Sequence, residues 1–236
     1  MTWIGGIDLS AWLYLVLAHL VADFLLQPYE LVKLKNRPLG LTIHAVVHGV
    51  ITAILVAPVL PRWGLIVPML VVVHYLLDWL KVARGPSAGP VSLVIFLADQ
   101  AAHLTVLLLA VLASGLSFDA QIVYASPAAT AVLYYAIPYL AVTVAGAILV
   151  YQVALAFRTR VDPGLVLAWR ERLAGMIERG LALTVVLFLR PSLWPAAVLP
   201  ALIIAWPARQ ARGRWIEAAW SVGFAFVLGL LFRTWM

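Results

Sequence analysis

Apolar runs of roughly 20 residues recur along the whole sequence, and they constrain the fold more than any other feature. A helix of about 20 residues crosses the hydrocarbon core of a bilayer. Because lipid cannot hydrogen-bond to backbone groups, such runs must be helices. Of the 236 residues, 65% are hydrophobic and only 11% are charged, whereas soluble domains are about a quarter charged. The sequence therefore predicts an all-α fold, a polytopic transmembrane helical bundle.

Five spans can be placed directly, near residues 8–28, 40–60, 64–83, 91–115 and 128–157. The first has no basic n-region and carries His19 and Asp23, so we expect a retained span rather than a signal peptide. Beyond them, an apolar run ends at Leu189, a proline-containing break follows, and a second run ends near Trp206. This region is compatible with one broken span or with two short ones. With a last run near 215–234, the total is seven or eight spans.

Basic residues gather in alternate loops, as expected where Lys and Arg mark the cytoplasmic side. They follow the first, third and fifth spans at Lys33, Lys35, Arg37, Lys81, Arg84, Arg158, Arg160, Arg170 and Arg172, whereas the loops between carry only Arg62. This pattern places the N-terminus outside a bacterial cytoplasmic (inner) membrane. The cluster Arg209, Arg212 and Arg214 then lies inside only if the proline-interrupted region crosses twice, which favours eight spans. The net charge of +6 is thereby explained as a topology signal, and no nucleic-acid partner is expected.

An internal repeat relates the first two spans to the next two. The pairs His19/His74, Asp23/Asp78, His44/Asp99 and His48/His103 are all separated by the same 55 positions (for example 74 − 19). A fixed offset indicates a duplicated unit, in this case a two-helix hairpin whose copies share one orientation. We therefore divide the chain into residues 1–115, a four-helix bundle that holds the candidate site, and residues 116–236, the C-terminal transmembrane helices.

The repeated residues are candidate metal ligands. Residues four apart lie on one face of a helix, so each of the four spans offers two ligands, all in the cytoplasmic half of the membrane. Ionisable groups at such depth mark function, and no Lys or Arg is expected there to balance the carboxylates. Imidazole and carboxylate suit zinc, iron or manganese, and paired ligands on four helices are typical of two-metal sites. The predicted ligands are His19, Asp23, His44, His48, His74, Asp78, Asp99 and His103.

Other arrangements stay open. In a one-metal site some aspartates would orient histidines instead, and a haem would not explain three aspartates. The chain contains no cysteine, so thiolate ligands are excluded. Gln27 and Gln100 are candidates for the polar network. Lys81 and Arg179 are weaker candidates for contact with a substrate headgroup.

At these residues the sequence resembles a bacterial family of polytopic membrane proteins known as domain of unknown function 3307. The resemblance covers the N-terminal half well and the C-terminal half loosely. The motifs that carry it are His19-x3-Asp23-Phe24-x2-Gln27 with the lysines after it, His44-x3-His48, His74-x3-Asp78-x2-Lys81, Asp99-Gln100-x2-His103 and Glu178-Arg179. It implies no activity. The same motifs are distantly similar to those of membrane-bound metal-dependent hydrolases, by analogy only.

Several functions fit a divalent-metal cluster in a membrane. The first is a hydrolase acting on a lipid or an amphipathic phosphorylated substrate, with Asp23, Asp78 or Asp99 as a bridging ligand or base and two metal ions that generate hydroxide. The second is a di-iron lipid oxidoreductase, a desaturase or hydroxylase, although such enzymes usually have adjacent histidines. The third is a divalent-metal or proton-coupled transporter, but the outer halves of the spans are almost wholly apolar. A structural metal site is the remaining interpretation.

Overall fold

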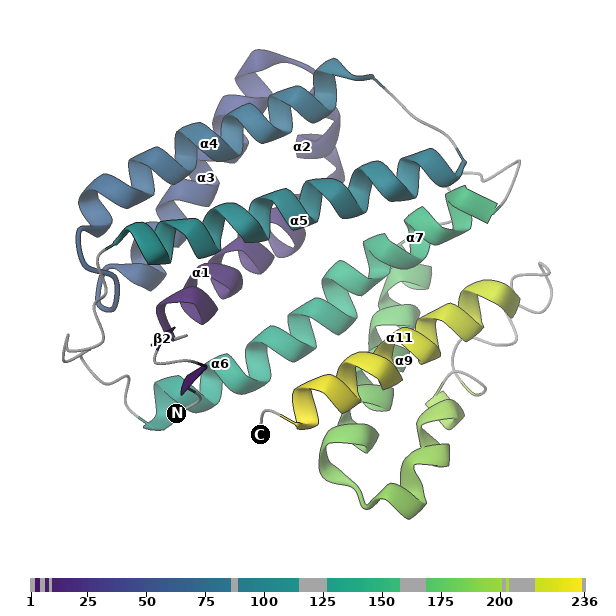
Figure 1. Ribbon diagram of the computed structural model, residues 1–236. Helices are drawn as coiled ribbons and strands as arrows, with labels where there is room; N and C mark the ends of the chain where they lie inside the picture. The colour runs from purple at the N-terminus through teal and green to yellow at the C-terminus, as the bar shows by residue number, and fades with distance from the viewer. Residues whose placement is uncertain are drawn as a thin grey trace. The chain divides into compact units, whose positions relative to one another are not determined.

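In the residues that it describes, the computed structural model is all-helical apart from one minimal strand pair, in agreement with the predicted all-α class. It describes residues 3–4, 7–8, 10–85, 89–114, 127–157, 169–200, 203 and 215–234. The elements are β1 (Trp3–Ile4), β2 (Ile7–Asp8), α1 (Ser10–Leu20), η1 (Val21–Leu25), α2 (Tyr29–Leu34), α3 (Pro38–Val56), α4 (Trp63–Ala83), α5 (Pro90–Ala113), α6 (Pro127–Leu140), η2 (Ala141–Ala145), α7 (Gly146–Phe157), α9 (Trp169–Phe188), η3 (Pro191–Val198) and α11 (Trp215–Arg233). Figure 1 shows them along the chain.

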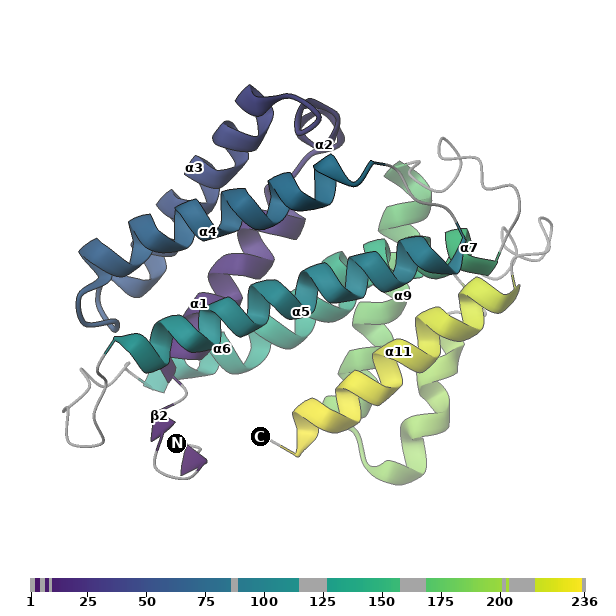
Figure 2. The same cartoon turned by 45° about the horizontal axis from the view of Figure 1, so that its top comes forward.

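The chain divides into two compact units, one formed by 1–86 and 95–137 and the other by 87–94 and 138–236. All eight predicted ligands lie in the first unit. In that unit α3 packs against both α1 and α4, and α2 lies where α3 begins and α4 ends (Figures 1 and 2).

Prolines begin several of the helices. Pro38, Pro90, Pro127 and Pro191 each occupy the first position of a helix, where the missing N–H has no partner to lose. Gly85 and Gly89 have φ values of 75° and 64° between α4 and α5, a region that glycine enters without strain. These prolines and glycines explain why the helices begin and end close to the predicted span boundaries.

The first predicted span, 8–28, is not one continuous helix. The backbone widens into the π-helical turn η1, in which the N–H of Leu26 bonds to the carbonyl of Val21. Pro28 then adopts an extended conformation and the short helix α2 follows. A proline cannot continue the hydrogen-bonding pattern of a helix, so the chain turns, and the lysines after Pro28 stay close to the bundle.

The apolar core of the first unit lies at one end of its helices. It joins the start of α1, the end of α3, the start of α4 and the end of α5, where Leu15, Val56, Leu70 and Val111 are buried. The candidate ligands lie away from this core, at the end of α1 and in η1, near the middle of α3, in the second half of α4 and near the middle of α5. The antiparallel course of the chain therefore separates an apolar half from a polar half, as the residue depths predict.

In the second unit, α9 packs against α11 and η3, with Leu183, Val186 and Ala197 in its core. α9 ends before Arg190, where the chain reverses direction so that η3 packs against α9. The proline-interrupted region therefore consists of two helical segments. The second is described to residue 200 and at residue 203. The predicted loop clusters Arg158 with Arg160 and Arg209 with Arg212 and Arg214 lie outside the described residues.

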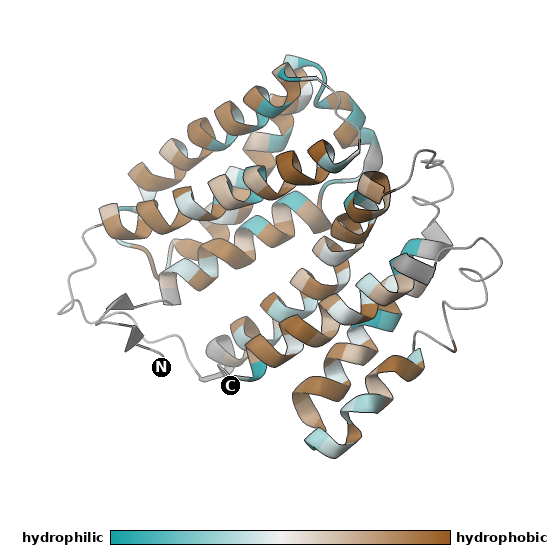
Figure 3. Ribbon diagram, turned by 45° about the vertical axis from the view of Figure 1, so that its right-hand side comes forward, coloured by the Kyte–Doolittle hydropathy of each residue, from teal (hydrophilic) through white to brown (hydrophobic). Residues whose placement is uncertain are grey.

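Within the described parts of the chain, four helices are long and apolar enough to cross a membrane: Pro38–Val56, Trp63–Ala83, Pro90–Ala113 and Ala131–Phe157. Their outward faces are strongly apolar, with Leu65 75% and Ile54 66% exposed. Figure 3 shows apolar residues along most of these ribbons and hydrophilic ones gathered near α2. Soluble proteins rarely expose so much apolar surface, so these helices indicate a membrane protein.

Candidate metal centre

The structure brings the eight predicted ligands together from four helical segments. His19 and Asp23 come from α1 and η1, and each of α3, α4 and α5 adds the two residues predicted on it. All five histidines and both Asp23 and Asp78 are buried, at most 7% exposed, and the Asp99 side chain is equally hidden, at 7%. Clusters of potential metal-binding atoms, each within 4.8 Å of the others, are formed by His19/Asp23/His48/His74, by His44/His74/Asp78 and by Asp78/Asp99/His103.

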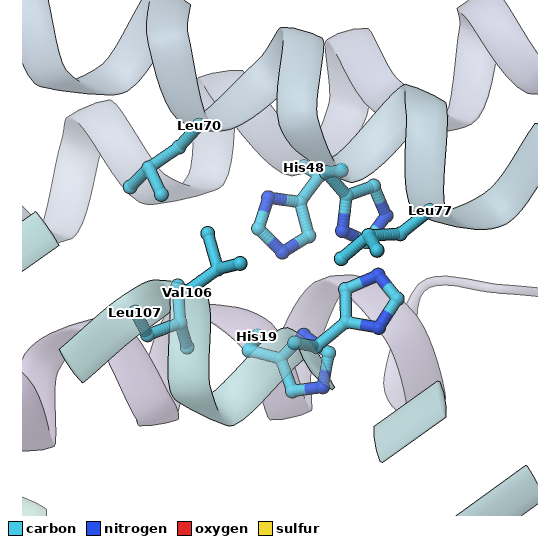
Figure 4. Close-up of a pocket in the computed structure, with 8 residues that line it drawn as sticks. His19, His48, Leu70, Leu77, Val106 and Leu107 are labelled. Atoms are coloured by element: carbon cyan, nitrogen blue, oxygen red, sulfur yellow. The ribbon is translucent and has the colours of Figure 1, made fainter. Parts of the chain in front are cut away.

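Four of the histidines line a small cavity at the apolar side of this cluster. His19, His48, His74 and His103 come from four different helices, and leucine and valine side chains complete the wall. Figure 4 shows the rings of His19 and His48 pointing into the space, beside Leu70, Val106 and Leu107. The cavity measures about 10 Å³, roughly the room for a single water molecule.

His48 and His103 each have one nitrogen anchored and the other facing the cluster. His103 Nδ1 donates to the backbone carbonyl of Asp99 at 2.8 Å, and His48 Nδ1 lies 3.3 Å from Thr52 Oγ1. The Nε2 atoms of both rings are buried and have no hydrogen-bond partner. Anchoring one nitrogen while presenting the other is the arrangement of metal-binding histidines.

Two glutamines also contact histidines of the cluster, and together with Thr52 they form an outer layer of polar residues around it. His19 Nε2 lies 3.3 Å from Gln100 Oε1, and the buried His19 Nδ1 has no hydrogen-bond partner. The Gln27 amide is best oriented with its nitrogen donating to the Asp23 carbonyl at 2.9 Å and its oxygen accepting from Lys35 at 2.7 Å. His44 Nδ1 lies 3.5 Å from the same amide group. Both glutamines therefore belong to the polar network, as the sequence suggested.

Asp23 Oδ1 is the most central of the carboxylate oxygens. It lies 3.3 Å from His44 Nε2, 3.5 Å from His74 Nε2 and 4.0 Å from His48 Nε2, yet has no well-formed hydrogen bond. The widened turn η1 carries this residue, and such turns are frequent at functional sites.

One expectation was wrong: lysines do reach the carboxylates. Lys35 Nζ lies 2.5 Å from Asp78 Oδ2, and Lys81 Nζ lies 2.6 Å from Asp99 Oδ2. Lys35 reaches inward because the chain turns at Pro28 and α2 lies against α3, while Lys81 extends its flexible stem from the end of α4. Two of the three aspartates thus have a cationic partner, and Asp23 is surrounded by histidines.

Arg179 lies in the second unit and is 2% exposed. Its guanidinium donates to the carbonyls of Val142 and Thr143 at 2.8 and 2.9 Å and to Ser221 Oγ at 3.1 Å. Both carbonyls belong to the π-helical turn η2, where widening changes the regular bonding pattern. The structure places Arg179 in the interior of this unit, so its expected contact with a headgroup is not part of the function we propose.

Sequence reasoning missed Thr52 and the role of Lys35. Thr52 extends the His44-x3-His48 pattern by another four positions, so its place on the same helix face could have been predicted. The contact of Lys35 with Asp78 could not be predicted from helical spacing, because Lys35 follows a break in the helix and Asp78 lies far from it in the sequence.

Fold and site together define a class: all-helical proteins with membrane-length apolar helices and a buried cluster of histidines and aspartates. The chain belongs to the family of proteins of unknown function DUF3307, whose model matches residues 12–132. That range contains every predicted metal ligand and confirms the resemblance. No curated protein and no solved structure matches the chain.

Proposed function

We propose that this protein is an integral membrane metal-dependent hydrolase that acts on a lipid or an amphipathic phosphorylated substrate. The observation that carries the proposal is a set of buried metal-binding atoms in this cluster that have no hydrogen-bond partner among the described residues. These atoms are His19 Nδ1, Asp23 Oδ1, His48 Nε2 and His103 Nε2. A buried polar atom without a partner costs about 1–3 kcal/mol. A divalent cation would offset that cost for several of them together.

Asp78 lies at metal-ligand separations from His44 and His74, whose Nε2 atoms are within hydrogen-bond distance of each other. The Nε2 atoms of His44 and His74 are 3.0 Å apart, and Asp78 Oδ2 lies 3.5 and 3.6 Å from them. Four ligands around a zinc ion at about 2.0–2.1 Å lie roughly 3.3–3.4 Å from one another. Imidazole and carboxylate are ligands that zinc, iron and manganese accept.

Two ions fit the cluster better than one. The groups His19/Asp23/His48/His74 and Asp78/Asp99/His103 share no residue, so each could hold an ion while the other is filled. Asp78 also belongs to a group with His44 and His74 and is therefore the best candidate for a bridging ligand. Such a pair of ions would polarise an ester or phosphoryl oxygen and supply hydroxide near neutral pH.

The duplicated hairpin is part of the proposal, and the ring geometry supports it. The offset of 55 positions matches His19 with His74 and His48 with His103, so the pair His19/His103 corresponds to the pair His48/His74. The rings of both pairs stack with an interplanar angle of 24°. The pair His19/His48 corresponds in the same way to the pair His74/His103, and the interplanar angles of these ring pairs are 60° and 63°. Similar angles in related pairs are expected for two copies about a local axis.

We propose eight spans in the cytoplasmic membrane, with the N-terminus outside and the cluster in the cytoplasmic half. The proposal is supported by four basic residues that lie at the same end of the first unit as the candidate ligands. They are Lys33, Lys35, Lys81 and Arg84. Basic residues mark the cytoplasmic side. The substrate would then reach the site from the cytoplasmic headgroup layer.

Elemental analysis of the detergent-purified protein tests this proposal. We expect close to two equivalents of zinc or manganese in the wild type and strongly reduced metal in His48→Ala and Asp78→Ala. Glu30→Gln is the matched control, because this carboxylate is 82% exposed in the same unit, and it should keep all its metal. Phosphate release from phosphorylated lipids by the metal-loaded protein would identify the hydrolase.

The other outcomes are equally informative. A wild type that takes up no metal even after reconstitution contradicts the proposal. Bound iron with a visible absorbance band would favour the oxidoreductase instead, and metal release across liposome membranes would favour a transporter.

A further inference from the structure

We propose that Lys35 and Lys81 are the anion-binding residues of the site and bind a terminal phosphate group once metal is bound at Asp78 and Asp99. The ligand chemistry is a terminal phosphate group, supplied by a lipid headgroup that ends in a phosphate monoester or by free phosphate. This inference rests on the proposed metal centre and names the part of the substrate that the site would recognise.

The first step of the argument is that a lysine and a metal would share the same carboxylate groups. Lys35 contacts Oδ2 of Asp78, and Lys81 contacts Oδ2 of Asp99. Both carboxylates belong to the candidate metal group that His103 completes. Ammonium and divalent cation repel each other at such distances. Metal at this position would therefore weaken both lysine contacts.

The second step is the charge of the cluster. The three aspartates and two lysines leave one negative charge when the histidines are neutral. One divalent ion makes the cluster positive by one charge, and two ions make it positive by three. A buried excess of positive charge is costly unless an anion joins it. The cluster with its metal therefore calls for an anionic ligand.

The third step is where the two ammonium groups can go. The Lys35 side chain is 13% exposed and that of Lys81 is 38% exposed, so both are within reach of the polar end of the first unit. Lysine has a flexible stem and a compact charge, and it commonly binds phosphate as a point charge. Together they would hold a phosphate beside the metals, with its organic part toward the membrane surface.

The test compares metal and phosphate binding in Lys35→Gln and Lys81→Gln, with the full chain in phosphatidylcholine nanodiscs. Each lysine competes with metal, so each variant should bind zinc more tightly. Each should also bind inorganic phosphate roughly tenfold more weakly, the loss expected for a hydrogen bond to a charged group. Lys33→Gln is the control, since Lys33 pairs with the exposed Glu30 on the same helix, and it should behave as the wild type.

A second series identifies the source of the phosphate. Tighter binding of a short-chain phosphatidic acid than of inorganic phosphate indicates a lipid headgroup, and equal affinities indicate free phosphate. Both results support the lysine site, provided that the two variants lose the affinity.

Opposite changes in metal and phosphate affinity separate this role from a purely structural one. A structural role predicts that both affinities fall, and that result overturns the inference, as do unchanged phosphate affinities or phosphate binding that needs no metal. A wild type without metal contradicts the proposed function itself and is recognised at the first measurement.

Discussion

At the scale of single residues, the histidines differ in what anchors the ring nitrogen that faces away from the cluster. A backbone carbonyl anchors His103, so no side-chain substitution removes it. The Thr52 hydroxyl anchors His48, so this anchor can be removed by a side-chain substitution that leaves every candidate ligand in place. Thr52 is 1% exposed, so it contributes through this contact and through packing.

Thr52→Val tests the anchor of His48. Valine has the shape of threonine and lacks the hydroxyl, so the ring of His48 loses a fixed orientation. We expect metal affinity to fall about tenfold, the lower end of what removing such a partner costs. Thr42→Val on the same helix removes a hydroxyl that bonds only to the carbonyl of Pro38 and should leave the affinity unchanged. Competition with a fluorescent chelator measures both; equal affinities would show that Thr52 does not anchor His48.

At the scale of helices, the site depends on how closely α3 and α4 approach. Gly49 follows His48 directly, and a Cβ atom at this position would collide with the side chain of Val71 on α4. Gly40 likewise allows the start of α3 to lie against the backbone of Leu34 and Lys35. Both glycines therefore hold ligand-bearing segments together.

Gly49→Ala should separate α3 from α4. We expect a loss of about 1–3 kcal/mol in stability, as for overpacking of a core, together with weaker metal binding. Gly64→Ala on α4 is the control, because nothing lies within 4 Å of its Cβ position and alanine favours a helix. Thermal unfolding in detergent, read by tryptophan fluorescence, measures the difference. A Gly49→Ala protein as stable as the control would contradict the close contact.

At the scale of the molecule, every candidate ligand lies in one of two units. Metal that binds only the folded state stabilises it by about 2.7 kcal/mol at 100 times the dissociation constant. Hydrogen exchange with and without chelator should therefore show slower exchange on metal binding within residues 38–83, and little change within 169–188. Asp78→Ala should lose the effect. Protection spread evenly over both units would place the metal elsewhere.

The sequence by itself determined the helices and the residues that form the cluster. Apolar runs of membrane length and the four-residue spacing of His19 with Asp23 or of His44 with His48 are local patterns, and a helix converts spacing into position with few alternatives. The fixed offset of 55 positions between the His and Asp pairs also indicated which residues belong together. For these reasons the composition of the cluster and the helices near 40–60, 64–83 and 91–115 agree with the structure, whereas the predicted span 8–28 is interrupted.

Only the tertiary structure decided what each ligand faces. Lys35 reaches Asp78 although 43 positions separate them (78 − 35), and this contact depends on the turn at Pro28 and the widened backbone at Asp23. The buried place of Arg179 depends in the same way on carbonyls of a π-helical turn. A local sequence pattern indicates the period of a helix. It does not indicate where that helix is interrupted or which distant segment packs against it. Contacts such as that of Lys35 with Asp78 therefore form only when the helices pack together.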